Sequence, residues 1–186
     1  FNSLFLKALK DLDFLLEFTG KSSSSLKKYI LLNESKLVKL FNSKKMKFKN
    51  KDLKNNTSVE IPSITNFFML FADLNNNLIN RELIKSLKKY YKNEKYFFPS
   101  ISSKHKSFEE KRYWRGPVWV NCNWIIYQGL KNKDKKFAKI IRKKTINLIE
   151  KKKFREYYSC KSGLGMGAKN FSWTAALYLD FKLNRS

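Results

Sequence analysis

Apolar residues recur at intervals of three and four positions along most of the chain, a spacing typical of amphipathic helices. The pattern predicts helices over residues 3–19, 25–42, 78–92, 134–150 and 172–183. Polar, lysine-rich segments separate them, so each predicted helix has one apolar face to bury against a neighbour.

Two further helices are predicted to begin at Pro62 and at Pro117, because proline is tolerated at the first helical position. The long segment 93–116 is expected to be a loop, and segment 153–170, with three glycines, a flexible loop. Strand signals are weak, with one short strand expected around Met46–Phe48. The fold class is therefore all-α, with about seven helices paired as in a toroid or solenoid of helical hairpins.

Composition supports a folded domain. Of the 186 residues, 42% are hydrophobic and 16% aromatic, which is enough apolar material for a core and excludes a wholly disordered chain. No stretch of about 18 apolar residues without charge occurs, so no membrane span is expected. The two cysteines, Cys122 and Cys160, cannot form a disulfide scaffold.

The chain carries a formal net charge of +25, from 40 basic and 15 acidic residues. Such an excess raises the possibility of a nucleic-acid partner. However, 34 of the basic residues are lysine, only six are arginine, and they are spread over every segment. Phosphate and base recognition favours arginine. We therefore expect a solvated lysine surface and no nucleic-acid partner; duplex DNA binding with a steep salt dependence would reverse this expectation.

The segment RYWRGPVWVNCNW, residues 112–124, is unusually dense in three Trp, one Tyr, two Arg and two Asn. Aromatic rings offer flat apolar faces to the C–H faces of a sugar, and Arg and Asn can bond its hydroxyls. The alternative is that the Trp residues are core. Trp124 fits the core better, whereas Trp114, Arg115 and Trp119, at the junction of loop and helix, fit a binding site better.

A second segment, FREYY followed by SGLGMG, places Glu156 between aromatic residues and beside a glycine-rich stretch. These surroundings suit a catalytic acid or base, although the local pattern alone favours a surface carboxylate paired with lysine. The glycines are not a phosphate loop, because no Lys-Ser/Thr follows them in the required order. One His and two distant Cys make no metal site, and no cofactor is implied.

Together with the segment FSWTAAL, residues 171–177, these motifs resemble a known family. RYWRGPVWVNCNWIIYQGL and FREYYSCKSGLGMGAKNFSWTAALYLDF are similar to the C-terminal half of the catalytic domain of glycoside hydrolase family 63. That family includes the processing α-glucosidase I and the bacterial mannosylglycerate hydrolases, and the bacterial branch looks closer. The earlier stretch from IPSITNFFMLFADL to YFFPSIS resembles the same domain more loosely.

The resemblance implies an (α/α)6 toroid barrel and an inverting hydrolysis with two carboxyl groups. The glutamate of the family's Glu-Tyr segment falls on Glu156, which would be the general base. Trp173 would close the sugar pocket, and six residues would line it: Tyr113, Trp114, Arg115, Trp119, Asn121 and Asn123.

The resemblance also implies that residues 1–186 are the C-terminal portion of one catalytic domain whose N-terminal part is missing. The chain begins with Phe1 inside a predicted helix. The family's general acid lies on an earlier loop, and no Asp here matches it, since Asp11 and Asp13 fall within the first predicted helix. The chain alone is therefore expected to lack this acid.

The predicted function is that of an inverting glycosidase fragment acting on an α-linked glucoside or mannoside. Mannosylglycerate, glucosylglycerate and α-gluco-oligosaccharides are candidate substrates, so a carbohydrate is the expected partner. The alternative is a non-catalytic carbohydrate-binding module or a degenerate barrel remnant. Two cysteines without a disulfide pattern favour the cytoplasm, and the oligomeric state is left open.

Overall fold

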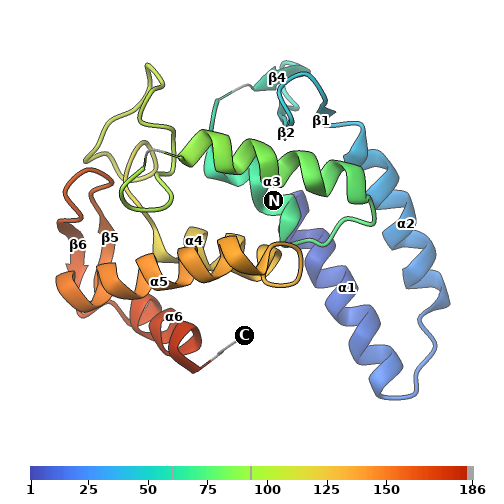
Figure 1. Ribbon diagram of the computed structural model, residues 1–186. Coiled ribbons are helices and arrows are strands. Elements are labelled where there is room, and N and C mark those ends of the chain that lie inside the picture. Colours follow the sequence, from blue (N-terminus) through green and yellow to red (C-terminus); the bar gives the residue numbers. More distant parts are fainter. Residues whose placement is uncertain (60, 93, 184–186) are drawn as a thin grey trace. The chain divides into compact units, whose positions relative to one another are not determined.

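The computed structural model describes residues 1–59, 61–92 and 94–183. Within these ranges the chain forms six α-helices, one 3₁₀ helix and three two-stranded antiparallel sheets (Figure 1). The predominantly helical character that the apolar spacing predicts is confirmed. The short strand expected around Met46–Phe48 is present at Lys47–Phe48, and the other five strands were not predicted.

The chain divides into two compact units, residues 1–60 with 66–86 and residues 61–65 with 87–186. The first unit contains α1 (Asn2–Phe18), α2 (Ser24–Val38), the hairpin of β1 (Phe41–Asn42) and β2 (Lys47–Phe48), the hairpin of β3 (Asn50–Asp52) and β4 (Thr57–Val59), most of the 3₁₀ helix η1 (Ile64–Leu70), and most of α3 (Asn77–Tyr91).

In the first unit α1 and α2 pack together as a helical hairpin. Leu6 is the only described residue of α1 that is fully buried, and α2 buries Ile30 and Leu37. The buried Glu34 carboxylate pairs with the Lys10 ammonium at 2.6 Å. A buried charge needs such a partner, so this pair ties the two helices together.

The second unit contains the motifs RYWRGPVWVNCNW, FREYY and FSWTAAL. Its elements are the C-terminal end of α3, α4 (Val120–Leu130), α5 (Lys135–Lys152), the hairpin of β5 (Arg155–Tyr158) and β6 (Gly165–Lys169), and α6 (Ser172–Leu183). The helix α4 packs against both α5 and α6, and it buries most of its surface because it is apolar on nearly every side.

The helix predicted to begin at Pro117 begins instead at Val120, with Trp119 in an extended conformation before it. The reason is tertiary pairing: Val118 forms isolated antiparallel bridges with both Pro99 and Tyr158. These bridges hold Pro117 and Val118 in an extended backbone, and this outweighs the local preference of proline for a first helical turn.

Two other predicted boundaries need correction. The helix expected over 25–42 ends at Val38, because the chain turns into the first β-hairpin. The segment 153–170 is not a flexible loop, because most of it forms the β5–β6 hairpin. Glycine-rich β6 has little strand propensity, so its strand depends on pairing with β5.

Candidate active site

Four aromatic side chains gather where the long loop meets α4. The indole rings of Trp114 and Trp119 stack with centroids 4.0 Å apart and planes 6° apart. Tyr157 of β5 stacks on Trp119 at 5.0 Å, and Tyr113 meets Trp119 and Tyr157 edge-on at 4.8 and 5.5 Å. In this aromatic cluster Trp119 is buried, but Tyr113 and Trp114 are 49% and 43% exposed, so ring surface faces solvent.

Backbone pairing between distant segments assembles the aromatic cluster. The Val118 amide donates to the Tyr158 carbonyl at 2.8 Å, and the Tyr158 amide donates back to the Val118 carbonyl at 2.9 Å. This pair brings Trp119 beside Tyr157. The Trp119 indole N–H also donates to the Tyr113 carbonyl at 2.9 Å, which fixes the end of the loop to the start of α4.

Glu156 lies next to the aromatic cluster, with both carboxylate oxygens hydrogen-bonded. The Tyr113 hydroxyl donates to Oε1 at 2.8 Å, and the Ala168 amide of β6 donates to Oε2 at 3.0 Å. In a regular strand, Glu156 and Tyr157 would point to opposite faces. The β5–β6 register shifts between Arg155 and Tyr157, and such an irregularity re-aims side chains. Both Glu156 and Tyr157 thus contact Tyr113.

A glycine leaves room for this carboxylate. Gly167 has a φ of +69°, and a Cβ added there would lie 2.5 Å from the Glu156 Oε2 atom. The hydrogen bond to Glu156, helped by partial burial, raises the pKa of the Tyr113 phenol above its ordinary value. Tyr113 therefore stays a protonated donor at neutral and mildly alkaline pH.

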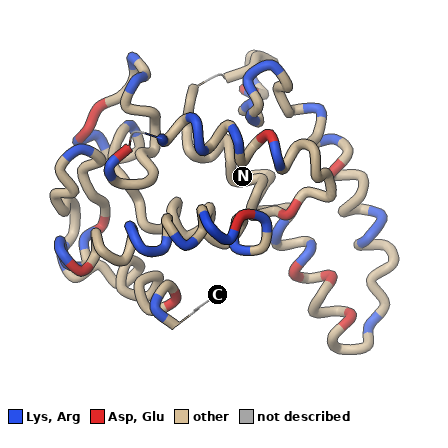
Figure 2. The backbone as a smooth tube through the Cα atoms, viewed as in Figure 1, with Lys and Arg blue, Asp and Glu red and all other residues tan. Residues whose placement is uncertain are grey.

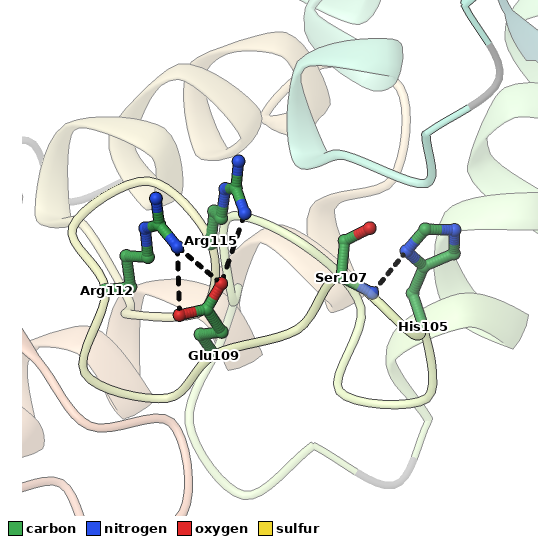
Figure 3. A network of polar contacts seen from close by, with 5 residues as sticks. All are labelled: His105, Ser107, Glu109, Arg112 and Arg115. Atoms are coloured by element: carbon green, nitrogen blue, oxygen red, sulfur yellow. Dashed lines mark hydrogen bonds and ion pairs between the residues drawn. The ribbon is translucent and has the colours of Figure 1, made fainter.

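Arg115 takes part in a separate network within the loop. Its guanidinium pairs with the Glu109 carboxylate at 3.1 Å, and Arg112 pairs with the same carboxylate at 3.0 Å (Figure 3). The Glu109 amide donates to the Arg115 carbonyl at 2.8 Å, which closes the loop on itself. A Cβ at Gly116 would lie 2.4 Å from the Glu109 carbonyl oxygen, so only glycine fits there. The structure therefore places Arg115 in an ion-pair network within the loop.

The two predicted asparagines differ in their surroundings. Asn123 is fully buried; its Oδ1 accepts from the Phe98 amide at 2.6 Å, and its Nδ2 donates to the Phe97 carbonyl and to the Thr145 hydroxyl. These partners anchor the loop to α4 and α5, so Asn123 has a structural role. Asn121 is partly exposed, and its Oδ1 atom is buried without a hydrogen-bond partner.

The remaining tryptophans lie on α6 and α4. Trp173 is 46% exposed at the start of α6, and its ring contact in the described structure is with Phe171, at 6.4 Å, and not with the aromatic cluster. The Trp124 indole N–H donates to the Asp180 carboxylate at 2.6 Å, between α4 and α6. This placement agrees with the expectation that Trp124 is a packing residue.

Two groups of the site are absent from the predicted site residues. They are the Tyr157 ring, which belongs to the aromatic cluster, and the Ala168 backbone amide, which donates to Glu156. The segment FREYY pointed to Tyr157 as a flanking aromatic, but no local signal identifies a backbone donor supplied by a paired strand.

A separate pocket of about 380 Å³ lies between the end of α3 and the start of α5. None of the predicted site residues lines it. In the described ranges, no group of three His, Cys, Asp or Glu is arranged to hold a metal ion. Within the same ranges, no helix combines the length and apolar character that a membrane span requires.

The chain is similar to known glycoside hydrolases. It is 30% identical over 182 residues to the mannosylglycerate hydrolase of Thermus thermophilus, an alignment that covers 96% of this chain and 43% of that protein. It is 32% identical over 84 residues to the glucosylglycerate hydrolase of Mycolicibacterium hassiacum, which covers 45% of this chain and 19% of that protein. The chain thus spans less than half the length of these relatives.

A solved structure is similar over nearly the whole chain. It is the family 63 mannosylglycerate hydrolase of Thermus thermophilus in complex with Tris and D-glycerate, with a TM-score of 0.91 and 28% identity. The match covers 97% of this chain and 44% of that one. Residues 1–174 match the mannosylglycerate hydrolase MGH1-like glycoside hydrolase domain. The chain therefore belongs to the MGH1-like glycoside hydrolase family.

Proposed function

We propose that this chain is the C-terminal portion of an inverting glycoside hydrolase in which Glu156 is the general base. The observation that carries the proposal is the Glu156 carboxylate, which lies beside a partly exposed aromatic cluster and is bonded to one of its members, Tyr113. Aromatic faces suit the C–H faces of a sugar, and a fixed carboxylate beside them can take a proton from water.

For the substrate we propose an α-linked mannoside or glucoside of glycerate. The support comes from the relatives, which are named mannosylglycerate and glucosylglycerate hydrolases. Tyr113, Trp114, Trp119 and Asn121 would contact the sugar. Asn121 is included because its buried Oδ1 lacks a partner and a buried acceptor favours a ligand hydroxyl. Arg115 and Trp173 remain candidate sugar-binding residues.

The inverting mechanism needs a second carboxyl group that protonates the leaving oxygen, about 6.5–9.5 Å from the base so that a water fits between them. We propose that this acid lies in a segment outside the 186 residues. We also propose that this segment completes an (α/α)6 barrel with the helices of the present chain, in keeping with the chain's coverage of 43% and 44% of its relatives.

The test is an assay of the full-length protein on mannosylglycerate and glucosylglycerate, with Glu156→Gln beside the wild type. We expect the substitution to lower kcat by at least about 10³-fold, because the amide cannot accept the proton, while substrate binding by calorimetry persists. Glu150→Gln is the matched control, since Glu150 also bonds to a tyrosine, Tyr178, at 2.9 Å on other elements.

Two outcomes would contradict the proposal. Unchanged turnover by Glu156→Gln would remove Glu156 from the role of base. Binding of the glycerate conjugates without hydrolysis by the wild-type protein would favour the alternative, a non-catalytic carbohydrate-binding remnant. The anomer released in the first seconds, followed by NMR, separates inversion from retention.

A further inference from the structure

We propose that Tyr113 is a positioning residue, which holds the Glu156 carboxylate in the orientation that a general base requires. The inference rests on the proposed role of Glu156. In this role the Tyr113 hydroxyl orients the Glu156 carboxylate, while the Tyr113 ring also offers a surface to the sugar.

The Tyr113 hydroxyl is held in place from several sides. The Tyr113 carbonyl accepts the Trp119 indole N–H at 2.9 Å. The Tyr113 ring is fixed edge-on against Trp114, Trp119 and Tyr157, at centroid distances of 6.1, 4.8 and 5.5 Å. The backbone of Tyr113 has a φ of +28°, a conformation that a residue with a large side chain adopts only when its surroundings enforce it. These restraints fix the hydroxyl as a donor.

Each of the two donors to Glu156 binds a different carboxylate oxygen. Tyr113 occupies one lone pair of Oε1 at 2.8 Å, and the Ala168 amide occupies one of Oε2 at 3.0 Å. Each oxygen keeps a second lone pair, so the carboxylate can still accept a hydrogen bond from water. Two donors from different elements, the loop and β6, therefore fix the plane of the group.

Ionisable side chains lie on the loop and on both strands around Glu156. They are Tyr113 of the loop, Arg155, Tyr157 and Tyr158 of β5, and Lys169 of β6. The Arg155 guanidinium donates to the Gly167 carbonyl at 3.2 Å. Tyr113 is thus the side chain whose bond to Glu156 can be removed by a single-atom change.

The experiment compares kcat and KM of the wild type, Tyr113→Phe and Tyr178→Phe in the full-length protein. Tyr113→Phe keeps the ring and removes the donor. We expect its kcat to fall at least about tenfold, because a small displacement of a reacting group is costly in catalysis, with KM changed less than about threefold. Tyr178→Phe also deletes a tyrosine–glutamate hydrogen bond, at 2.9 Å to Glu150, and its kcat is expected to match that of the wild type.

A second measurement needs no turnover. With ¹³C-labelled tyrosine ring carbons, NMR follows the phenol titration in the full-length protein, and the Tyr113 signal is identified by its loss in Tyr113→Phe. In Glu156→Gln, the Tyr113 phenol should titrate at lower pH than in the wild type, because the pKa-raising bond to the carboxylate is gone.

The outcomes separate the two proposals. If the wild type hydrolyses glycerate glycosides but Tyr113→Phe keeps the wild-type kcat, the positioning role is wrong while the proposed function stands. If the phenol titrates identically in Glu156→Gln and the wild type, the bond itself is absent and the inference is overturned. Absence of any hydrolysis, together with a shifted phenol titration, would overturn the function and not the contact.

Discussion

Gly167 shows how one residue without a side chain controls the position of another. Its φ of +69° is a left-handed conformation that L-residues avoid at a cost of about 1–2 kcal/mol. In addition, a Cβ there would lie 2.5 Å from Oε2 and 2.8 Å from Cβ of Glu156. A side chain at position 167 would therefore strain the backbone and also collide with Glu156, the proposed base.

We expect Gly167→Ala to lower both stability and activity. The stability loss should exceed about 2 kcal/mol, and kcat should fall at least about tenfold because a displacement of about 1 Å is costly in catalysis. Gly20→Ala is the matched control, since Gly20 has a φ of +71° with no atom within 4 Å of the added Cβ. Urea unfolding of both variants isolates the cost of the collision. Equal losses in the two variants would show that Glu156 is not displaced.

At the scale of elements, the sequence predicted most helices and missed the pairing that builds the site. The helices α3, α5 and α6 lie close to their predicted ranges because each carries a regular apolar pattern. The β5–β6 hairpin and the Val118–Tyr158 bridge were not predicted. Both depend on contacts between segments far apart in sequence, which a local pattern does not encode.

The predicted site residues show the same division. The composition of residues 112–124 favoured Trp114, Arg115 and Trp119; the structure brings the two tryptophans together in the aromatic cluster, whereas Arg115 pairs with Glu109. The family resemblance added Tyr113, which joins the cluster, and Asn123, which anchors the loop. Residue types suited to a sugar also suit internal hydrogen bonds, so only burial and partners distinguish the two uses.

The start of α5 carries a prediction on stability. The Asp134 side chain caps the helix by accepting from the Phe137 amide at 3.0 Å, and it pairs with the Lys88 ammonium. Burial raises the pKa of Asp134, but the bonds from Lys88 and Phe137 and the charge of Lys136 outweigh burial and lower it. We expect Asp134→Ala to lower the free energy of unfolding by about 1 kcal/mol.

The pH dependence follows from the direction of that shift. Since the folded-state pKa of Asp134 lies below its value in the unfolded chain, near 3.9, its stabilisation is fully present above that value. It is lost as the pH falls through the folded-state pKa. The stability difference between the wild type and Asp134→Asn, from urea unfolding, should therefore shrink between about pH 4 and pH 2. A difference that grows on acidification would contradict this assignment.

At the scale of the whole molecule, positive charge is the dominant feature. Lysine and arginine occur on α1, α2, α3, α5 and α6 and on most of the connecting segments, but not on α4 (Figure 2). With a formal net charge of +25, like charges repel one another in the compact state. The ion pairs Lys7–Asp11, Lys27–Glu17 and Lys182–Glu150 are largely exposed, and exposed pairs contribute little, about 0–1 kcal/mol each.

Salt should therefore stabilise this protein. Screening shortens the range of the repulsion among 40 basic residues, to a Debye length of about 8 Å at 0.15 M, while it weakens only exposed pairs that contribute little. We expect Tm to rise by several degrees between about 20 mM and 300 mM NaCl at pH 7, with the same direction in KCl. Calorimetry in both salts checks the result and separates screening from ion-specific binding. If Tm fell instead, the stabilisation by the ion pairs would outweigh the repulsion among the lysines.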